Sequence, residues 1–167
     1  LFLFLAVLFW AGNFIVGKYA SYYEIPPFSL NFYRWFFAWL ILLPFTFEEI
    51  ISKKNYILEN YKFYILLGIT SVTIFNSIVY YSLNFTQVIS GVLMISTIPV
   101  MIMFISSILK IEKTNIFQIL GVIFSFVGVM LIITKANFDL LINLDFNKGD
   151  LTMVIAMLSW ATYSALL

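Results

Sequence analysis

The most constraining feature of this sequence is an uncharged apolar run that ends at Lys110. The run begins at Val88, reads VISGVLMISTIPVMIMFISSIL and holds 22 residues without a charge. A helix of about 20 apolar residues crosses the hydrocarbon core of a bilayer, which is about 30 Å thick. The run therefore predicts a membrane-spanning helix, and we expect the other helices of the chain to be arranged around it.

The composition indicates the same class of protein. The chain is 63% hydrophobic and 10% charged, whereas soluble domains average roughly 45–50% and about 25%. A net charge of +1 argues against a nucleic-acid partner, which would need a clustered basic face. The chain has no cysteine and no histidine, and histidine is the commonest metal ligand and general base. We therefore expect an integral membrane protein without a metal, a cofactor or an enzymatic activity.

Apolar runs separated by polar or proline-containing stretches predict an all-α membrane protein, a multi-pass helical bundle. We expect five spans, then a polar connector and the beginning of a sixth span, at 1–20, 28–47, 63–84, 88–109, 116–134, 135–150 and 151–167. Because the chain begins on leucine and ends inside an apolar run, we expect it to be part of a longer protein.

The lysines of the connecting loops predict the orientation in the membrane. One side carries Lys53, Lys54, Lys62, Lys110 and Lys113, and the other side carries Lys18, Lys135 and Lys148. Cytoplasmic loops are enriched in lysine and arginine. We therefore expect a protein of the cell membrane (the plasma or inner membrane) whose N-terminus lies in the cytoplasm.

A short repeat connects the two ends of the chain. Residues 6–11 and 156–161 are identical at four of six positions. Because five spans separate the starts of the two copies, the first and sixth spans cross the membrane in opposite directions. This is the arrangement of an inverted-topology repeat, which many transporters use to build a binding site at the repeat interface. The alternative is chance similarity between alanine- and leucine-rich helices.

Several motifs along the whole chain occur in the order typical of one family. They are Trp10-Ala11-Gly12-Asn13-Phe14, Pro27 with Arg34 and Ala38, Tyr80-Tyr81-Ser82-Leu83-Asn84-Phe85-Thr86, Pro99-Val100, Glu112 with Gln118, Gly121 and Gly128-Val129, Gly149-Asp150-Leu151, and Ser159-Trp160-Ala161. In these motifs the sequence resembles the EamA family of the drug/metabolite transporter superfamily.

The resemblance implies ten helices in two inverted repeats, and residues 1–134 would be the first repeat. It also implies a permease or exporter that moves small metabolites or drugs by alternating access. A membrane scaffold without transport activity is the alternative. The expected partners are a small-molecule substrate, membrane lipid and the second repeat of the same full-length chain, and a homodimer stays open.

Arg34 is the only charged residue well inside a predicted span, which makes it a candidate for substrate binding. Alternatively, its long side chain could snorkel to the interface. In the third span, Thr73, Asn76, Tyr80 and Asn84 form a polar stripe at helical spacing. We predict that Trp10, Asn13, Arg34, Asn76 and Tyr80 bind substrate; the alternative is hydrogen bonding between helices.

Pro99 interrupts the fourth span, because it has no N–H to donate to the carbonyl of Ile95. The hydroxyls of Ser96 and Thr97 could bond that carbonyl, and we predict that the three residues form a gating element. A static kink is the alternative. Small residues let a neighbouring helix approach closely, and three of them in the fifth span predict such a contact: Gly121, Ser125 and Gly128.

The predicted spans contain no aspartate or glutamate. We therefore expect this part of the protein to supply neither a carboxylate for proton coupling nor a counter-charge for a cationic substrate. Arg34 and the neutral polar stripe suit amino acids, organic anions or neutral metabolites better.

Overall fold

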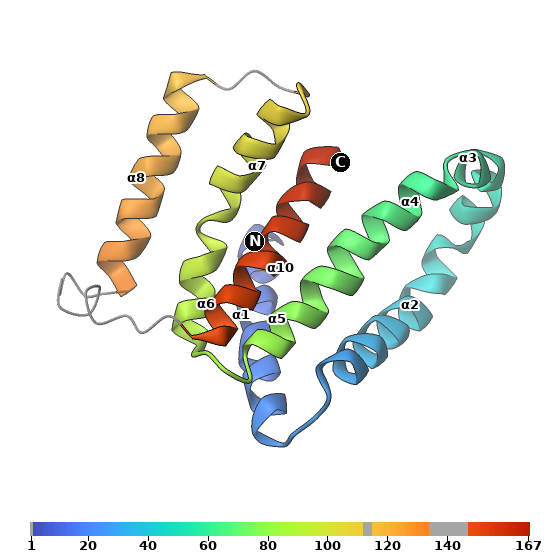
Figure 1. Ribbon diagram of the computed structural model, residues 1–167. Coiled ribbons are helices and arrows are strands. Elements are labelled where there is room, and N and C mark those ends of the chain that lie inside the picture. The colour runs from blue at the N-terminus through green and yellow to red at the C-terminus, as the bar shows by residue number, and fades with distance from the viewer. Residues whose placement is uncertain (1, 112–114, 134–146) are drawn as a thin grey trace.

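The computed structural model describes residues 2–111, 115–133 and 147–167 as helices joined by turns (Figure 1). In chain order these are α1 (Phe2–Tyr22), α2 (Pro27–Ser52), α3 (Lys54–Glu59), α4 (Tyr61–Gly68), the π-helix η1 (Ile69–Asn76), α5 (Ser77–Ser82), α6 (Val88–Ile95), α7 (Ile98–Ile108), α8 (Ile116–Ile133) and α10 (Lys148–Leu166).

Four helical stretches in these parts of the chain are long and apolar enough to cross a membrane. They are Phe2–Tyr22, Pro27–Ser52, Tyr61–Ser82 and Val88–Ile108. Their side chains leave many large apolar groups exposed, including Phe45 and Phe104, as expected for surfaces that face lipid. The prediction of an all-α, multi-pass membrane bundle is confirmed.

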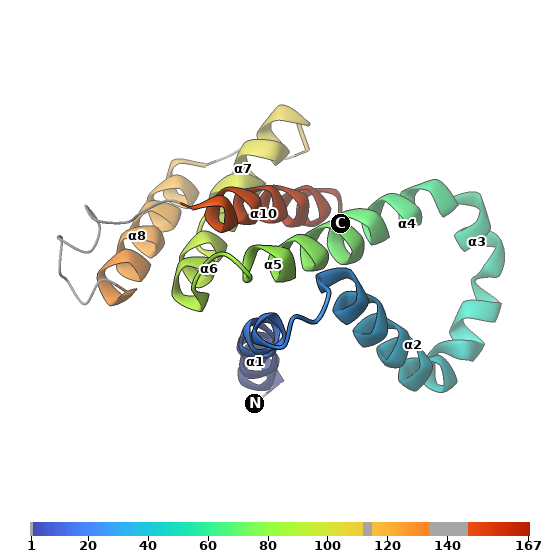
Figure 2. The ribbon, with the colours of Figure 1, turned by 60° about the horizontal axis from the view of Figure 1, so that its bottom comes forward.

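The second helix is longer than the sequence predicts. We expected it to end at residue 47, but α2 continues to Ser52, and α3 follows almost at once at the bend of a wide α2–α3–α4 hairpin (Figure 2). An exposed ion pair between Lys53 Nζ and Glu49 Oε1, 2.6 Å apart, joins residues one turn apart at this end. Charged residues therefore extend the helix where we expected a polar loop.

In the part of the chain that the structure describes, the run from Val88 to Lys110 does not form the centre of the bundle, contrary to our expectation. The central helix is α10, which lies against η1, α5, α6 and α7 (Figures 1 and 2). Four of its side chains are fully buried: Met153, Ala156, Met157 and Ala161. A helix that is apolar all round can face lipid as well as protein. The small side chains of α10, in contrast, let neighbouring helices approach it closely.

The start of α10 is tied to the ends of α1 and α5. Lys18 Nζ donates hydrogen bonds to the carbonyls of Leu83 and Thr86 at 2.7 and 2.9 Å, and Thr86 Oγ1 donates to Asp150 Oδ1. A Cβ added at Gly149 would lie 2.7 Å from the Ser82 carbonyl oxygen, so α10 enters the bundle at a position that only glycine permits.

Asp150 corrects two expectations. We placed it in the polar connector, but α10 begins at Lys148 and Asp150 lies buried in its first turn. Asn147 and Asp150 form a capping box, in which each side chain bonds the other residue's backbone N–H. This motif starts a helix earlier than hydropathy indicates. The expectation of no carboxylate within these helices therefore fails at Asp150, as it does at Glu48 and Glu49 in the extended α2.

The helix α8 lies at one edge of the molecule beside α6 and α7 (Figure 1). A Cβ added at Gly121 or Gly128 would meet no atom within 4 Å. Within the described residues, therefore, these glycines do not provide the close helix contact that we expected. Packing of this face, with Ser125, against parts of the protein outside the described residues stays a prediction.

Candidate functional site

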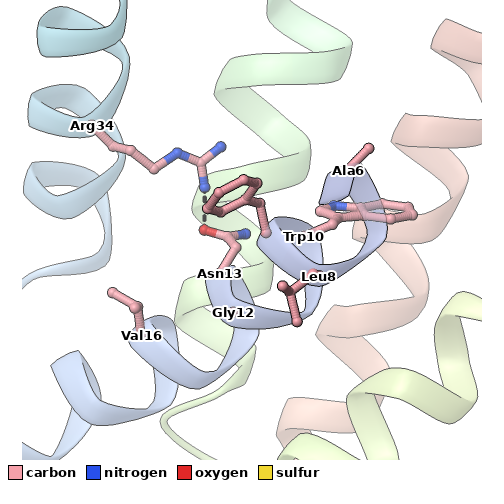
Figure 3. A pocket seen from close by; sticks show the side chains of 8 residues that line it. Ala6, Leu8, Trp10, Gly12, Asn13, Val16 and Arg34 are labelled. Atoms are coloured by element: carbon pink, nitrogen blue, oxygen red, sulfur yellow. Dashed lines mark hydrogen bonds between the residues drawn. The ribbon is translucent and has the colours of Figure 1, made fainter. Parts of the chain in front are cut away.

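Arg34 joins three helices through its guanidinium group. Its Nη1 donates to Asn13 Oδ1 on α1 (Figure 3) and to the Tyr80 hydroxyl on α5. Its Nη2 donates to Asn76 Oδ1 at the end of η1, at 3.0 Å. The Tyr80 hydroxyl in turn donates to Asn13 Oδ1. These four residues are called the Arg34 cluster below.

The guanidinium group points into the bundle, and it does not snorkel to the interface. It lies 5.4 Å from the Trp35 ring and 5.7 Å from the Tyr80 ring. In the parts of the chain that the structure describes, no carboxylate forms an ion pair with Arg34. An unpaired charge in apolar surroundings raises the free energy of the folded protein unless polar groups or a ligand compensate it.

The polar groups that remain free around Arg34 are hydrogen-bond donors. A guanidinium has five N–H groups, and three bonds of Arg34 end within the cluster. The remaining N–H groups have no partner among the described residues, and neither do Asn13 Nδ2 and Trp10 Nε1. An arginine fork with free N–H groups matches a carboxylate or a phosphate. The cluster is therefore suited to bind an anion.

The Arg34 side chain borders a pocket of about 650 Å³. The lining of the pocket is partly polar and partly apolar. Arg34 and Asn13 supply polar groups, and the Trp10 ring lies beyond Asn13 as seen from Arg34 (Figure 3). Its other lining residues are Ala6, Leu8, Phe9, Gly12 and Val16. No acidic side chain is among the residues that line it. A ligand with an anionic group and an apolar body would fit both parts of this lining.

The structure brings all five predicted substrate-binding residues to this place, with Asn13, Arg34, Asn76 and Tyr80 in the cluster and Trp10 in the pocket. Their role in binding stays a prediction. Thr73 and Asn84 from the predicted stripe lie elsewhere: Thr73 borders a different pocket, and Asn84 donates to the Tyr80 and Tyr81 carbonyls at the helix end.

The stripe is interrupted because η1 is wound as a π-helix. Its backbone bonds span five residues instead of four, so the spacing on which the stripe was predicted does not hold through residue 76. The sequence offers one weak signal of this, a run of β-branched side chains at Ile69, Thr70, Val72, Thr73 and Ile74, since β-branched residues fit an α-helix less well.

Pro99 lies in the first turn of α7, after a break between α6 and α7. The Ser96 and Thr97 hydroxyls donate to the carbonyls of Leu93 and Met94, each at 2.6 Å. They thus bond earlier carbonyls than that of Ile95, where we expected them. A pocket of about 420 Å³ separates this break from Gly121 and Ser125 on α8. A gating role for this break stays a prediction.

Trp10 and Trp160, the equivalent tryptophans of the short repeat, contact each other. Their ring centroids are 6.2 Å apart, and the Phe75 ring lies 4.6 Å from that of Trp160.

Within residues 2–111, 115–133 and 147–167, no group of three or more aspartate, glutamate, histidine or cysteine side chains could hold a metal ion.

Comparison with known proteins gives one consistent result. The sequence profile described as "EamA-like transporter family" matches residues 1–134. The chain is 29% identical to "Uncharacterized transporter YyaM" of Bacillus subtilis (strain 168), over 95% of this chain and 52% of that protein. It is also 29% identical to an "Uncharacterized transporter" of Archaeoglobus fulgidus, over 97% and 54%.

A third relative, "Uncharacterized transporter YoaV" of Bacillus subtilis (strain 168), is 24% identical over 92% of this chain and 51% of that protein. The chain therefore spans about half the length of the curated relatives it matches. No solved structure shows significant similarity to it.

Proposed function

The chain belongs to the EamA-like transporter family, and we propose that the whole protein transports small metabolites that carry a carboxylate or a similar anionic group. The observation that carries this proposal is the Arg34 guanidinium. It has free N–H groups, its side chain borders the pocket, and it has no acidic partner among the described residues. Amino acids and organic anions have the required group. Transport fits better than catalysis, because the chain has no histidine and no cysteine.

The residues around the pocket have separate roles in this proposal. Arg34 binds the anionic group with its free N–H groups, and Asn13 adds an amide N–H from α1. Tyr80 and Asn76 accept hydrogen bonds from the guanidinium and fix its direction. Trp10 and the apolar part of the lining contact the body of the substrate.

We propose that the site is completed by a second repeat, and that transport proceeds by alternating access between the two. The contact between Trp10 and Trp160 supports this, because equivalent residues of two units related by a two-fold axis meet only near that axis. Inverted-repeat transporters bind substrate at the interface of their repeats. In this proposal, the pocket beside Trp10 belongs to that interface.

The proposed location is the cell membrane, with the N-terminus in the cytoplasm. The lysines at the two ends of the bundle differ in number and in the groups that they contact. Lys54, Lys62 and Lys110 are exposed at one end, where Lys53 is also exposed and pairs with Glu49. At the other end, Lys18 is bonded to backbone carbonyls and Lys148 lies over the Tyr81 and Phe85 rings. More lysines thus lie on the end that the proposal places in the cytoplasm.

The proposal is tested with the full-length protein in proteoliposomes. Labelled benzoate, benzylamine and benzyl alcohol, which share an apolar body but differ in charge, are offered with and without a proton gradient. We expect protein-dependent flux of benzoate and little flux of benzylamine. Equal flux of the amine would contradict the anion site, and no flux of these compounds or of a broad mixture of carboxylates would favour a scaffold.

A further inference from the structure

The backbone of η1 is held by side chains from three elements. Each of three consecutive carbonyls accepts a side-chain hydrogen bond: Thr70 O from Ser159 Oγ of α10 at 2.8 Å, Ser71 O from Asn76 Nδ2 of η1 itself at 2.9 Å, and Val72 O from Asn31 Nδ2 of α2 at 2.9 Å. π-Helical winding is rare and occurs frequently at functional sites. In a membrane, backbone groups that the helix itself bonds poorly need partners from the protein, so these donors stabilise the π-winding.

Among these donors, Asn31 makes two hydrogen bonds with one amide nitrogen. It is buried, and its Nδ2 donates both to the Val72 carbonyl and to the Ser77 hydroxyl, each at 2.9 Å. Rotating the amide by half a turn would place its oxygen against the Val72 carbonyl, so the assignment of nitrogen and oxygen is unambiguous.

The Asn31 Oδ1 atom is buried and has no hydrogen-bond partner within the described residues. A buried acceptor without a donor raises the free energy of the folded protein. In the described part of the chain, the Asn31 amide therefore stabilises the folded protein only through the two hydrogen bonds that its Nδ2 donates, one to η1 and one to α5.

Asn31 and the Arg34 cluster act on the same turn of helix. Asn31 and Arg34 are three residues apart on one face of α2. Arg34 Nη2 donates to Asn76 Oδ1, while Asn31 bonds Val72 and Ser77 on either side of Asn76. The position of the Asn76 side chain opposite Arg34 thus depends on the winding that Asn31 stabilises.

We infer that Asn31 is a positioning residue for the anion site. By bonding Val72 and Ser77 it keeps η1 in its π-winding, and this winding presents Asn76 to Arg34. Without Asn31 the segment rewinds toward an α-helix, which turns Asn76 away from the guanidinium. The inference rests on the proposed function, because the site that Asn31 positions is the Arg34 cluster.

Two measurements on the full-length protein test this role. Hydrogen exchange of the backbone amides in residues 69–76 reports the winding, and the half-saturation concentration for benzoate flux reports the site. For Asn31→Ala we expect faster exchange in this segment and a rise in half-saturation of about tenfold, the effect of losing one hydrogen bond to a charged group. The maximal rate should change less. Ser77→Ala, which removes one of the two bonds, should change both quantities in the same direction by a smaller amount.

Asn84→Ala is the matched control, since Asn84 also donates to backbone carbonyls but lies beyond η1. Exchange and half-saturation that change no more in Asn31→Ala and Ser77→Ala than in Asn84→Ala would overturn the inference and leave the transport proposal intact. Faster exchange with an unchanged half-saturation would also overturn it. If wild-type protein moves no carboxylate at all, the proposed function fails, and the role of Asn31 fails with it.

Discussion

A Cβ atom added at Gly17 would lie 2.7 Å from Cδ1 of the Tyr80 ring. Real side chains essentially never approach so closely, so α1 and α5 contact each other at a point that requires glycine. Gly17 is one helical turn from Asn13, whose amide oxygen accepts the Tyr80 hydroxyl hydrogen bond. The close approach of these helices therefore determines where the Arg34 cluster forms.

Gly17→Ala should displace the Tyr80 ring and destabilise the protein by about 1–3 kcal/mol, the usual cost of overpacking. Thermal unfolding of the full-length protein in detergent measures this. Gly12→Ala in the same helix is the control, because its added Cβ meets nothing within 4 Å. Alanine is also the better helix former. Equal unfolding temperatures for the two variants would contradict the close contact.

The bond between Thr86 and Asp150 should stabilise the start of α10 measurably. Asp150→Ala removes this bond and half of the capping box, and we expect a loss of about 0.5–2 kcal/mol from the cap alone. A double-mutant cycle with Thr86→Val isolates the pair, for which we expect a coupling energy of about 0.5–3 kcal/mol. Strictly additive single effects would show that the two side chains do not interact.

The two tryptophans of the repeat should be energetically coupled. Aromatic pairs contribute roughly 0.5–1.5 kcal/mol beyond the area they bury. We therefore expect a coupling energy in this range from the cycle Trp10→Ala, Trp160→Ala and the double variant, measured by unfolding in detergent. The cycle Trp10→Ala with Trp35→Ala is the comparison, with no coupling expected. The same near-zero value for both cycles would contradict a contact at the repeat axis.

Single cysteines at the two ends of the bundle test the orientation. In a full-length protein whose other cysteines are replaced, a membrane-impermeant maleimide should label Lys54→Cys only from the cytoplasm. It should label Lys148→Cys only from outside. The expectation follows from the exposed lysines at the Lys54 end. The opposite labelling pattern would invert the proposed topology and leave the Arg34 cluster unchanged.

The sequence predicts the centre of the candidate site because the signals there are strong. Arg34 is a lone charge in an apolar span, and such residues are rare unless functional. Asn76 and Tyr80 follow at a spacing of four, which survives because the π-winding ends at residue 76. These features bring Asn13, Arg34, Asn76 and Tyr80 together without knowledge of the structure.

Other features of the fold and the site depend on tertiary contacts, which the hydropathy of a sequence does not predict. Thr73 leaves the stripe because the segment that contains both Thr73 and Asn76 is π-wound. Asn31 looks in the sequence like an ordinary polar residue near a helix start. The central position of α10 depends on small and flexible side chains such as Ala156 and Met157. Uniformly apolar helices look alike whether they face lipid or protein.

The most direct test of the account is benzoate flux by full-length protein carrying Arg34→Lys or Arg34→Gln. Lysine keeps the charge but lacks the planar fork of N–H groups. We expect Arg34→Lys to raise the half-saturation concentration by about tenfold or more and Arg34→Gln to abolish flux. Lys62→Gln, which removes an exposed charge, should behave as wild type. If both Arg34 variants fold and move benzoate with wild-type half-saturation, Arg34 does not bind the substrate and the central claim is wrong.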